Sequence, residues 1–183
     1  SILEQDIGKQ GGQVDHDSVH QTVSDMKEIL DSTVTKVREL SKELRPSVLD
    51  TSNIIEALEW QTQEFTNYSG IPVRFRNETE GFELNKDQSL AVFRIVQEAL
   101  TNIARHSRAD WGEVIVEEEN SSVMIKIHDN GVGFSIDEQE IQSSFGIINM
   151  RERASFCGGV LSIGSNEGAG TTVALRIPIA RPV

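Results

Sequence analysis

Four polar residues with complementary chemistry lie close together in the middle of this sequence. They are an acid, an amide, a cation and an imidazole: Glu98, Asn102, Arg105 and His106. On a helix these positions fall within about a quarter-turn of one another, opposite apolar residues that must face a core. Such a face can activate water, ligate magnesium and contact phosphate. A solvated helix face has a similar composition, so this spacing alone leaves both interpretations open.

A second candidate segment, His128-Asp129-Asn130-Gly131-Val132-Gly133, follows a predicted strand. The glycines allow a tight turn and a close approach of the backbone to a ligand. A carboxylate at the strand end can accept a hydrogen bond from an exocyclic amine. An ordinary Asp-Asn-Gly turn is the alternative, and no third glycine follows at the spacing of the dinucleotide-binding motif G-x-G-x-x-G.

Two further segments carry glycine beside polar residues. The stretch 143–153 runs into a helix whose first N–H groups can bind phosphate, and the polar residues 135–144 before it suit a mobile lid. Gly168-Ala169-Gly170-Thr171-Thr172 is a glycine turn with two hydroxyls at its exit. Each segment has an ordinary structural explanation, but their order along the chain is informative.

These segments require elements that hold them in place. Apolar periodicity predicts helices at 54–65, 87–106 and 147–156 and strands at 71–76, 113–118, 122–128, 160–163 and 172–177. Strands grouped beside segregated helices indicate an α+β fold, a two-layer α/β sandwich with helices on one face of a mixed sheet. Asn53, with Glu56 three residues later, is a predicted helix N-cap.

The N-terminal part of the sequence has a different pattern. Apolar residues between Val19 and Leu44 follow a 4-3-4-3 spacing, which predicts a long coiled-coil-like helix over 17–46 that dimerises. A helix packed on its own domain is the alternative. A glycine-rich break at 8–13 leaves only residues 1–7 for an antiparallel partner helix, so we expect a hairpin whose first helix is truncated. The predicted domains are 1–50 and 51–183.

Composition excludes several classes of function. The 183 residues carry 17 Lys+Arg against 29 Asp+Glu, a net charge of −12, which disfavours non-specific binding of nucleic acid or anionic membranes. No apolar run reaches the 18 or so residues that span a bilayer, and no signal peptide is recognisable. A single cysteine, Cys157, excludes an internal disulfide and fits a reducing compartment. We expect a cytosolic domain.

The motifs together resemble a known family. The order E-x-x-x-N-x-x-x-H, D-x-G-x-G, F-G-I-x-x-M-R-E-R and G-x-G-T-T is similar to the four nucleotide-binding boxes of the gyrase–Hsp90–histidine kinase–MutL superfamily of ATPases. The segments 44–50, 93–106 and 150–154 resemble sensor histidine kinases of the NarX/DesK type, which pair with NarL-class response regulators. The resemblance covers about residues 17–178.

The resemblance implies a role for each candidate residue. Glu98 is the expected general base. Asn102 is expected to coordinate the Mg²⁺ ion that bridges the phosphates of ATP. Arg105 and His106 are expected near the phosphates. Asp129 would accept from the adenine amino group, with Gly131 and Gly133 shaping the wall beside the purine.

The remaining implied contacts come from the last two boxes. Gly146 and Ile147 would offer backbone N–H groups to the phosphates as the lid closes. Gly170, Thr171 and Thr172 would belong to the nucleotide pocket, with Thr172 supporting Asp129 or a water beside adenine. Ser144 stands where the family often has another glycine, so we expect a slightly stiffer lid.

The resemblance also implies a phosphoacceptor histidine on the first helix of the hairpin. His16-Asp17 matches part of that motif, but it lies after the glycine break and too close to Leu44-Arg45-Pro46. We interpret His16 as a residue at the start of the second helix and expect the true acceptor to precede Ser1. This interpretation predicts ATP binding without phosphorylation of the chain itself.

The leading hypothesis is therefore the ATP-binding catalytic part of a two-component sensor histidine kinase. It uses ATP and Mg²⁺, forms a homodimer through 17–46, and acts on a NarL-class response regulator within a larger membrane-attached sensor. Another ATPase of the superfamily, such as a DNA-repair, topoisomerase or chaperone clamp, is a second hypothesis. A dimerisation module with a degenerate pocket is a third, and Mg²⁺-dependent ATP affinity separates it from the first.

Overall fold

The structure is a computed structural model that describes Met26 and residues 48–119, 121–135 and 144–179. The chain divides into two compact units, Ser1–Pro46 and Ser47–Val183. Apart from Met26, the predicted coiled-coil-like helix lies outside the described residues, as do the truncated hairpin, His16 and residues 136–143 of the predicted lid.

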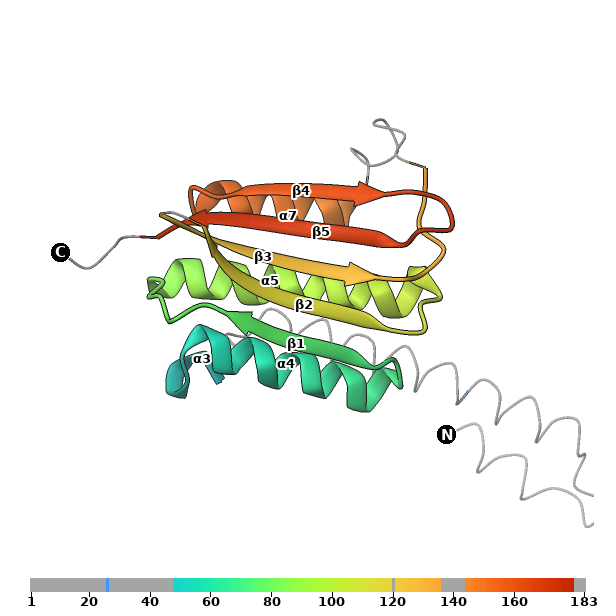
Figure 1. The fold of residues 1–183 in the computed structure, drawn as a ribbon, viewed down its shortest axis with the longest axis horizontal. Coiled ribbons are helices and arrows are strands. Elements are labelled where there is room, and N and C mark those ends of the chain that lie inside the picture. The colour runs from blue at the N-terminus through green and yellow to red at the C-terminus, as the bar shows by residue number, and fades with distance from the viewer. Residues whose placement is uncertain (1–25, 27–47, 120, 136–143, 180–183) are drawn as a thin grey trace, which may run out of the picture. The chain divides into compact units, whose positions relative to one another are not determined.

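The second unit has the predicted α+β fold, with helices and a mixed five-stranded sheet. Its helical segments are α3 (Val48–Thr51), α4 (Ile54–Ser69), α5 (Lys86–Asn102), the π-helical turn η1 (Ile103–Ser107) and α7 (Phe145–Phe156). Its strands are β1 (Val73–Glu78), β2 (Gly112–Glu119), β3 (Ser122–Asp129), β4 (Val160–Ser165) and β5 (Thr171–Pro178). Figure 1 shows α5 and α7 behind the strands and α4 alongside β1.

The strand order is β1-β2-β3-β5-β4, with β1 parallel to β2 and every other neighbouring pair antiparallel. Alternate residues of the three central strands point toward the helices and are buried: Val114, Val116, Val123, Ile125, Ile127, Val173, Leu175 and Ile177. This period of two is the alternation that the sequence predicted for β2 and β3. It gives the sheet one apolar face and one face toward solvent.

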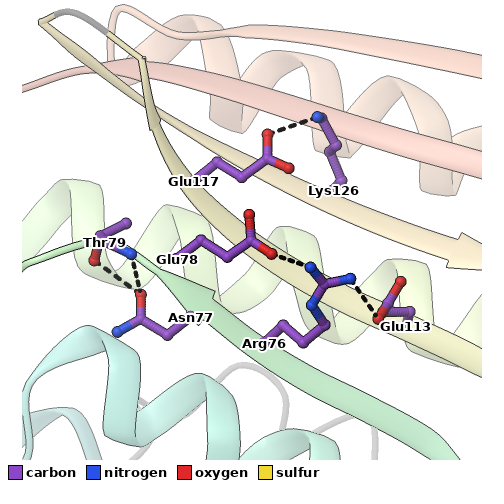
Figure 2. A network of polar contacts seen from close by, with 7 residues as sticks. All are labelled: Arg76, Asn77, Glu78, Thr79, Glu113, Glu117 and Lys126. Atoms are coloured by element: carbon purple, nitrogen blue, oxygen red, sulfur yellow. Dashed lines mark hydrogen bonds and ion pairs between the residues drawn. The ribbon is translucent and has the colours of Figure 1, made fainter.

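The solvent face of β1, β2 and β3 carries a ladder of charged side chains (Figure 2). Arg76 contacts both Glu78 and Glu113, and Lys126 Nζ lies 2.6 Å from Glu117 Oε2. Hydrogen bonding to Glu113 is the main cause that raises the pKa of Arg76, and hydrogen bonding to Glu117 raises the pKa of Lys126. Both cations therefore remain charged at any physiological pH.

Local capping explains where the long helices begin. The side chain of Asn53 accepts a hydrogen bond from the Glu56 N–H, as the sequence predicted for α4. Asn85 and Gln88 form a reciprocal capping box at the start of α5, which the sequence analysis did not identify. The α5 helix then buries Phe93, Val96 and Leu100 against the sheet.

The predicted helix over 87–106 is not uniform. Regular α-helix ends at Asn102 and continues as the wider turn η1, after which Arg108 adopts a left-handed conformation with φ 52°. Ser107 stabilises this ending, because its hydroxyl donates to the Ile103 carbonyl and accepts from the Ala109 N–H. Within the described residues, no helix is both long and apolar enough to cross a membrane.

Candidate functional site

A cavity of about 240 Å³ lies between the end of α5, the start of α7, the end of β3 and the start of β5. Six of the residues predicted from sequence line it: Asn102, His106, Asp129, Gly133, Ile147 and Thr171. Its other walls are largely apolar and include Ile127, Phe134, Met150, Ile163 and Val173. The cavity therefore combines a hydrophobic interior with a small set of polar groups, the usual composition of a small-molecule site.

Asp129 is the acidic group in this cavity and is only 4% exposed. It is the last residue of β3, and its carboxylate accepts a hydrogen bond from the Gly131 N–H at 2.8 Å. A carboxylate offers only acceptors, so a ligand reaching it must bring a donor. An aromatic ring with an amino group satisfies both the apolar walls and this acceptor.

Three of the predicted glycines are required because other parts of the backbone approach them closely. A methyl group on Gly131 would overlap the Ser107 carbonyl, and one on Gly170 would overlap the Asp129 carbonyl. On Gly133 it would overlap the Asn166 carbonyl. These glycines allow the loop after β3 to pack between η1 and the β4–β5 turn. Gly133 also lines the cavity, but Gly131 and Gly170 act through packing.

Backbone hydrogen bonds lock the same three segments together. The Val132 N–H donates to the Ser107 carbonyl at 2.7 Å, and the Gly168 N–H donates to the Val132 carbonyl at 2.6 Å. The side chain of Asn130 accepts from the N–H groups of Asp110 and Trp111, both at 3.0 Å. The end of β3 that carries Asp129 is thus held from both sides.

The two threonines of the last motif lie on opposite faces of the sheet. Thr171 pairs with Asp129 across β5 and β3 and lines the cavity. Thr172 pairs with His128, and its hydroxyl lies 3.0 Å from His128 Nδ1. Thr171, and not Thr172, is therefore the threonine that lies opposite Asp129, because successive strand residues point to opposite faces.

The helical side of the cavity brings together only part of the predicted polar face. Asn102 ends α5 and His106 lies in η1, and both line the cavity. Arg105 is exposed and is not among the lining residues. Glu98 is half-buried, one turn before Asn102, and its carboxylate lies against Gly146, where a methyl group would collide with Glu98 Oε1.

The start of α7 brings backbone N–H groups without an intrahelical partner to the edge of the cavity. Its N-cap, Ser144, lines the cavity but makes no side-chain capping hydrogen bond. Gly146 and Ile147 belong to the first turn, whose N–H groups have no partner within a helix. Such a terminus favours anions through both these donors and the helix dipole.

One buried residue of this region was missed by the sequence analysis. Ser165 ends β4 opposite Thr171, is 7% exposed, and contacts Phe134, Gly170 and Thr171 through its hydroxyl. A serine at the end of a short strand gives no signal in the sequence, because its role depends on segments that meet only in the fold.

The side chains that could bind a metal ion in the described residues are few. Across the described ranges, no group of three or more His, Cys, Asp or Glu residues is placed to hold a metal ion. The Asn102 amide on the cavity wall offers one oxygen donor. That donor set fits Mg²⁺, which takes few protein ligands and completes its octahedron with phosphate oxygens and water.

Comparison with known proteins assigns the chain to a family. Residues 87–181 match the family described as histidine kinase-, DNA gyrase B-, and HSP90-like ATPase. The chain belongs to this family. The match begins at α5 and includes every element that lines the cavity.

Relatives narrow the assignment to sensor histidine kinases. The chain is 32% identical over 163 residues to the signal transduction histidine-protein kinase/phosphatase DegS of Brevibacillus brevis, covering 89% of this chain and 42% of DegS. It is 38% identical over 144 residues to the sensor histidine kinase LiaS of Bacillus subtilis (strain 168), covering 79% of this chain and 39% of LiaS. The chain thus spans about two fifths of these relatives' length.

Solved structures agree on the fold. The Erythrobacter litoralis EL346 blue-light activated histidine kinase superimposes with a TM-score of 0.63 at 18% identity, over 83% of this chain and 50% of that one. The catalytic domain of histidine kinase ThkA superimposes with a TM-score of 0.56 at 15% identity, over 69% and 90%. The resemblance drawn from the motifs is confirmed: this is the ATP-binding catalytic domain of a sensor histidine kinase.

Proposed function

We propose that this domain binds ATP with Mg²⁺ in the cavity at the end of the sheet and supplies the γ-phosphoryl group for phosphorylation of a histidine. One observation carries the proposal. The buried carboxylate of Asp129 lies in an apolar cavity that also contains Asn102 and Ser144, at the N-terminus of α7. A ligand that fills this cavity needs a flat apolar body with a donor at one end and anionic, metal-binding groups at the other.

Each part of ATP has a matching group in the site. The adenine lies among Ile127, Met150 and Val173, with its amino group toward Asp129. The phosphates lie at the first turn of α7, at the N–H groups of Gly146 and Ile147. His106 faces the same space, while the exposed Arg105 acts at its margin. Mg²⁺, when bound, neutralises phosphate charge, and the Asn102 amide holds it.

Glu98 is the proposed general base of the transfer. Its carboxylate lies beside Gly146, next to the N–H groups proposed to hold the phosphates. From there it can orient or deprotonate an attacking imidazole, while the other groups fix the phosphates in line. Positioning provides most of the rate enhancement in this chemistry.

We further propose the wider setting that the resemblance implies. The phosphoryl group passes from the histidine to an aspartate of a NarL-class response regulator, and the kinase works as a homodimer through residues 17–46. The larger protein is membrane-attached, with this domain on its cytosolic side. The names of DegS and LiaS, a histidine kinase/phosphatase and a sensor histidine kinase, support the phosphotransfer part of this setting.

Calorimetric titration with ATP, in Mg²⁺ and in EDTA, tests the proposal on the 183-residue chain. The parent is expected to bind ATP more tightly in Mg²⁺. Asn102→Ala is expected to abolish that Mg²⁺ dependence without changing the thermal unfolding midpoint. Asn67→Ala, an exposed asparagine on α4, is the matched control and should behave like the parent.

Two results would contradict the proposal. A parent chain that does not bind ATP would favour a dimerisation module with a degenerate pocket. An Asn102→Ala variant with undiminished Mg²⁺ dependence would remove the metal role assigned to Asn102.

A further inference from the structure

Four residues form one row across the sheet on its helix-facing side. Gly112 pairs with Asp129, Asp129 with Thr171, and Thr171 with Ser165. Asp129 and Thr171 line the cavity, whereas Ser165 lies behind them and is 7% exposed. Ser165 therefore cannot touch a ligand in the cavity directly, but it is adjacent to a residue that can.

The Ser165 hydroxyl makes three hydrogen bonds. It accepts from the Phe134 N–H at 2.9 Å and donates to the Gly170 carbonyl at 3.1 Å, and its oxygen lies 3.0 Å from Thr171 Oγ1. The Asn166 N–H reaches the same Gly170 carbonyl only at 3.4 Å. That longer contact is a weak substitute, so the buried carbonyl needs the Ser165 proton.

The numbers of protons and lone pairs then fix the direction of the third bond. A hydroxyl has one proton and two lone pairs. An N–H group can only donate and a carbonyl can only accept, so Ser165 has one lone pair left for Thr171. Thr171 must donate its only proton to Ser165. Its oxygen then has nothing but lone pairs to offer toward the cavity.

We propose that Ser165 determines the base specificity of the pocket by holding the Thr171 hydroxyl as a hydrogen-bond acceptor. This inference rests on the proposed nucleotide binding. With both Asp129 and Thr171 presenting acceptors, the pocket favours a purine with an amino group at the six position. It disfavours hypoxanthine, because the two protons of the adenine amino group can satisfy both acceptors, whereas the carbonyl oxygen offers none and the single N1–H can satisfy only one.

The test compares dissociation constants of Mg·ATP and Mg·inosine triphosphate. Inosine triphosphate has a carbonyl oxygen in place of the six-position amino group and a proton on the neighbouring N1. The parent is expected to prefer ATP. In Ser165→Ala the Thr171 hydroxyl can turn and donate to the carbonyl, so the preference should fall about three- to tenfold, the value of one hydrogen bond. Ser162→Ala, on the same strand but exposed, should keep the parent preference.

A double-mutant cycle shows whether Ser165 acts through Thr171. Thr171→Val removes the hydroxyl at nearly constant shape and should lower the preference for ATP by itself. Adding Ser165→Ala to Thr171→Val should then change the preference no further. Thermal unfolding of each variant confirms that it is folded.

Several results would overturn the inference. If Ser165→Ala weakens the binding of both nucleotides equally and leaves the ratio of their dissociation constants unchanged, Ser165 is only a structural support. If Ser165→Ala does not fold, a Thr171→Val variant with the parent ratio still refutes the proposal. A parent that binds neither nucleotide would instead contradict the proposed function, so the two failures are distinguishable.

Discussion

The two faces of the sheet use polar residues in opposite ways. On the inner side, Asp129 and Ser165 are buried, and each has neighbours that fix its geometry. On the outer side, Arg76 and Lys126 form ion pairs, with 46% and 37% of their side chains exposed (Figure 2). One strand, β3, contributes Asp129 to the first region and Lys126 to the second.

The difference shows where polar contacts determine structure. A buried polar group without its partner costs a desolvation penalty, so the inner contacts must all be present together. An exposed ion pair replaces interactions of the two charges with water by their interaction with each other. It therefore contributes little to the free energy of unfolding. We therefore expect the buried contacts around Asp129 and Ser165 to be sensitive to the gain or loss of a single atom. The ion pairs of Arg76 and Lys126 on the outer face should tolerate substitution.

The largest effect is expected from Gly170→Ala. The new methyl group would overlap the Asp129 carbonyl, and the residue has φ 78°, which is strained for alanine. The free energy of unfolding should fall by about 2–4 kcal/mol, and Mg·ATP binding should be lost even where the variant remains folded. Chemical denaturation and calorimetry measure the two quantities.

Gly168→Ala is the matched control, because it separates crowding from backbone strain. Gly168 lies in the same turn with φ 75°, but a methyl group there would have no atom within 4 Å. It should cost only about 1 kcal/mol of stability and leave Mg·ATP affinity close to that of the parent. Equal losses in the two variants would show that crowding against Asp129 is unimportant.

The smallest effect is expected from Arg76→Gln, which removes the contacts to Glu78 and Glu113. The thermal midpoint should change little and the change should shrink further in high salt, because the pairs are exposed and screened. Mg·ATP affinity should be unaffected. A large, salt-independent loss of stability would show that the outer ladder is structural after all.

The outer face also predicts how stability depends on pH. The pKa of Lys126 is raised above its ordinary value of 10.5, chiefly by its hydrogen bond to Glu117. A raised pKa on a lysine stabilises the fold fully below the ordinary value, and this contribution is lost only as pH rises above it. Lys126 is therefore expected to contribute no change in stability between pH 6 and 8, a range well below that value.

Local signals in the sequence were enough to predict most of the fold and the central site residue. Alternation predicted β2 and β3, and the apolar spacing predicted the buried side of α5. Asp129 and the glycines after it were recognised from a motif of consecutive residues. The Asn85–Gln88 capping box was also readable, because its two residues stand at the usual spacing, but it was missed.

The rest depended on contacts between distant segments. The different roles of Thr171 and Thr172 follow from strand register, and a shift of one residue exchanges the two faces. Ser165 acts because Phe134 and Gly170, from two different loops, meet at its hydroxyl. The widening of the helix at η1, which carries Arg105 and His106, also has no signature in the apolar pattern.

The central claim is that Asp129 recognises a nucleotide base in the cavity at the end of β3. The most direct test is calorimetric titration of the parent chain and Asp129→Asn with Mg·ATP, beside Asp110→Asn as an exposed control. We predict that Asp129→Asn keeps its fold but binds Mg·ATP about ten- to a hundredfold more weakly than the parent, the value of a charged hydrogen bond. A folded Asp129→Asn variant that binds Mg·ATP as tightly as the parent would contradict it.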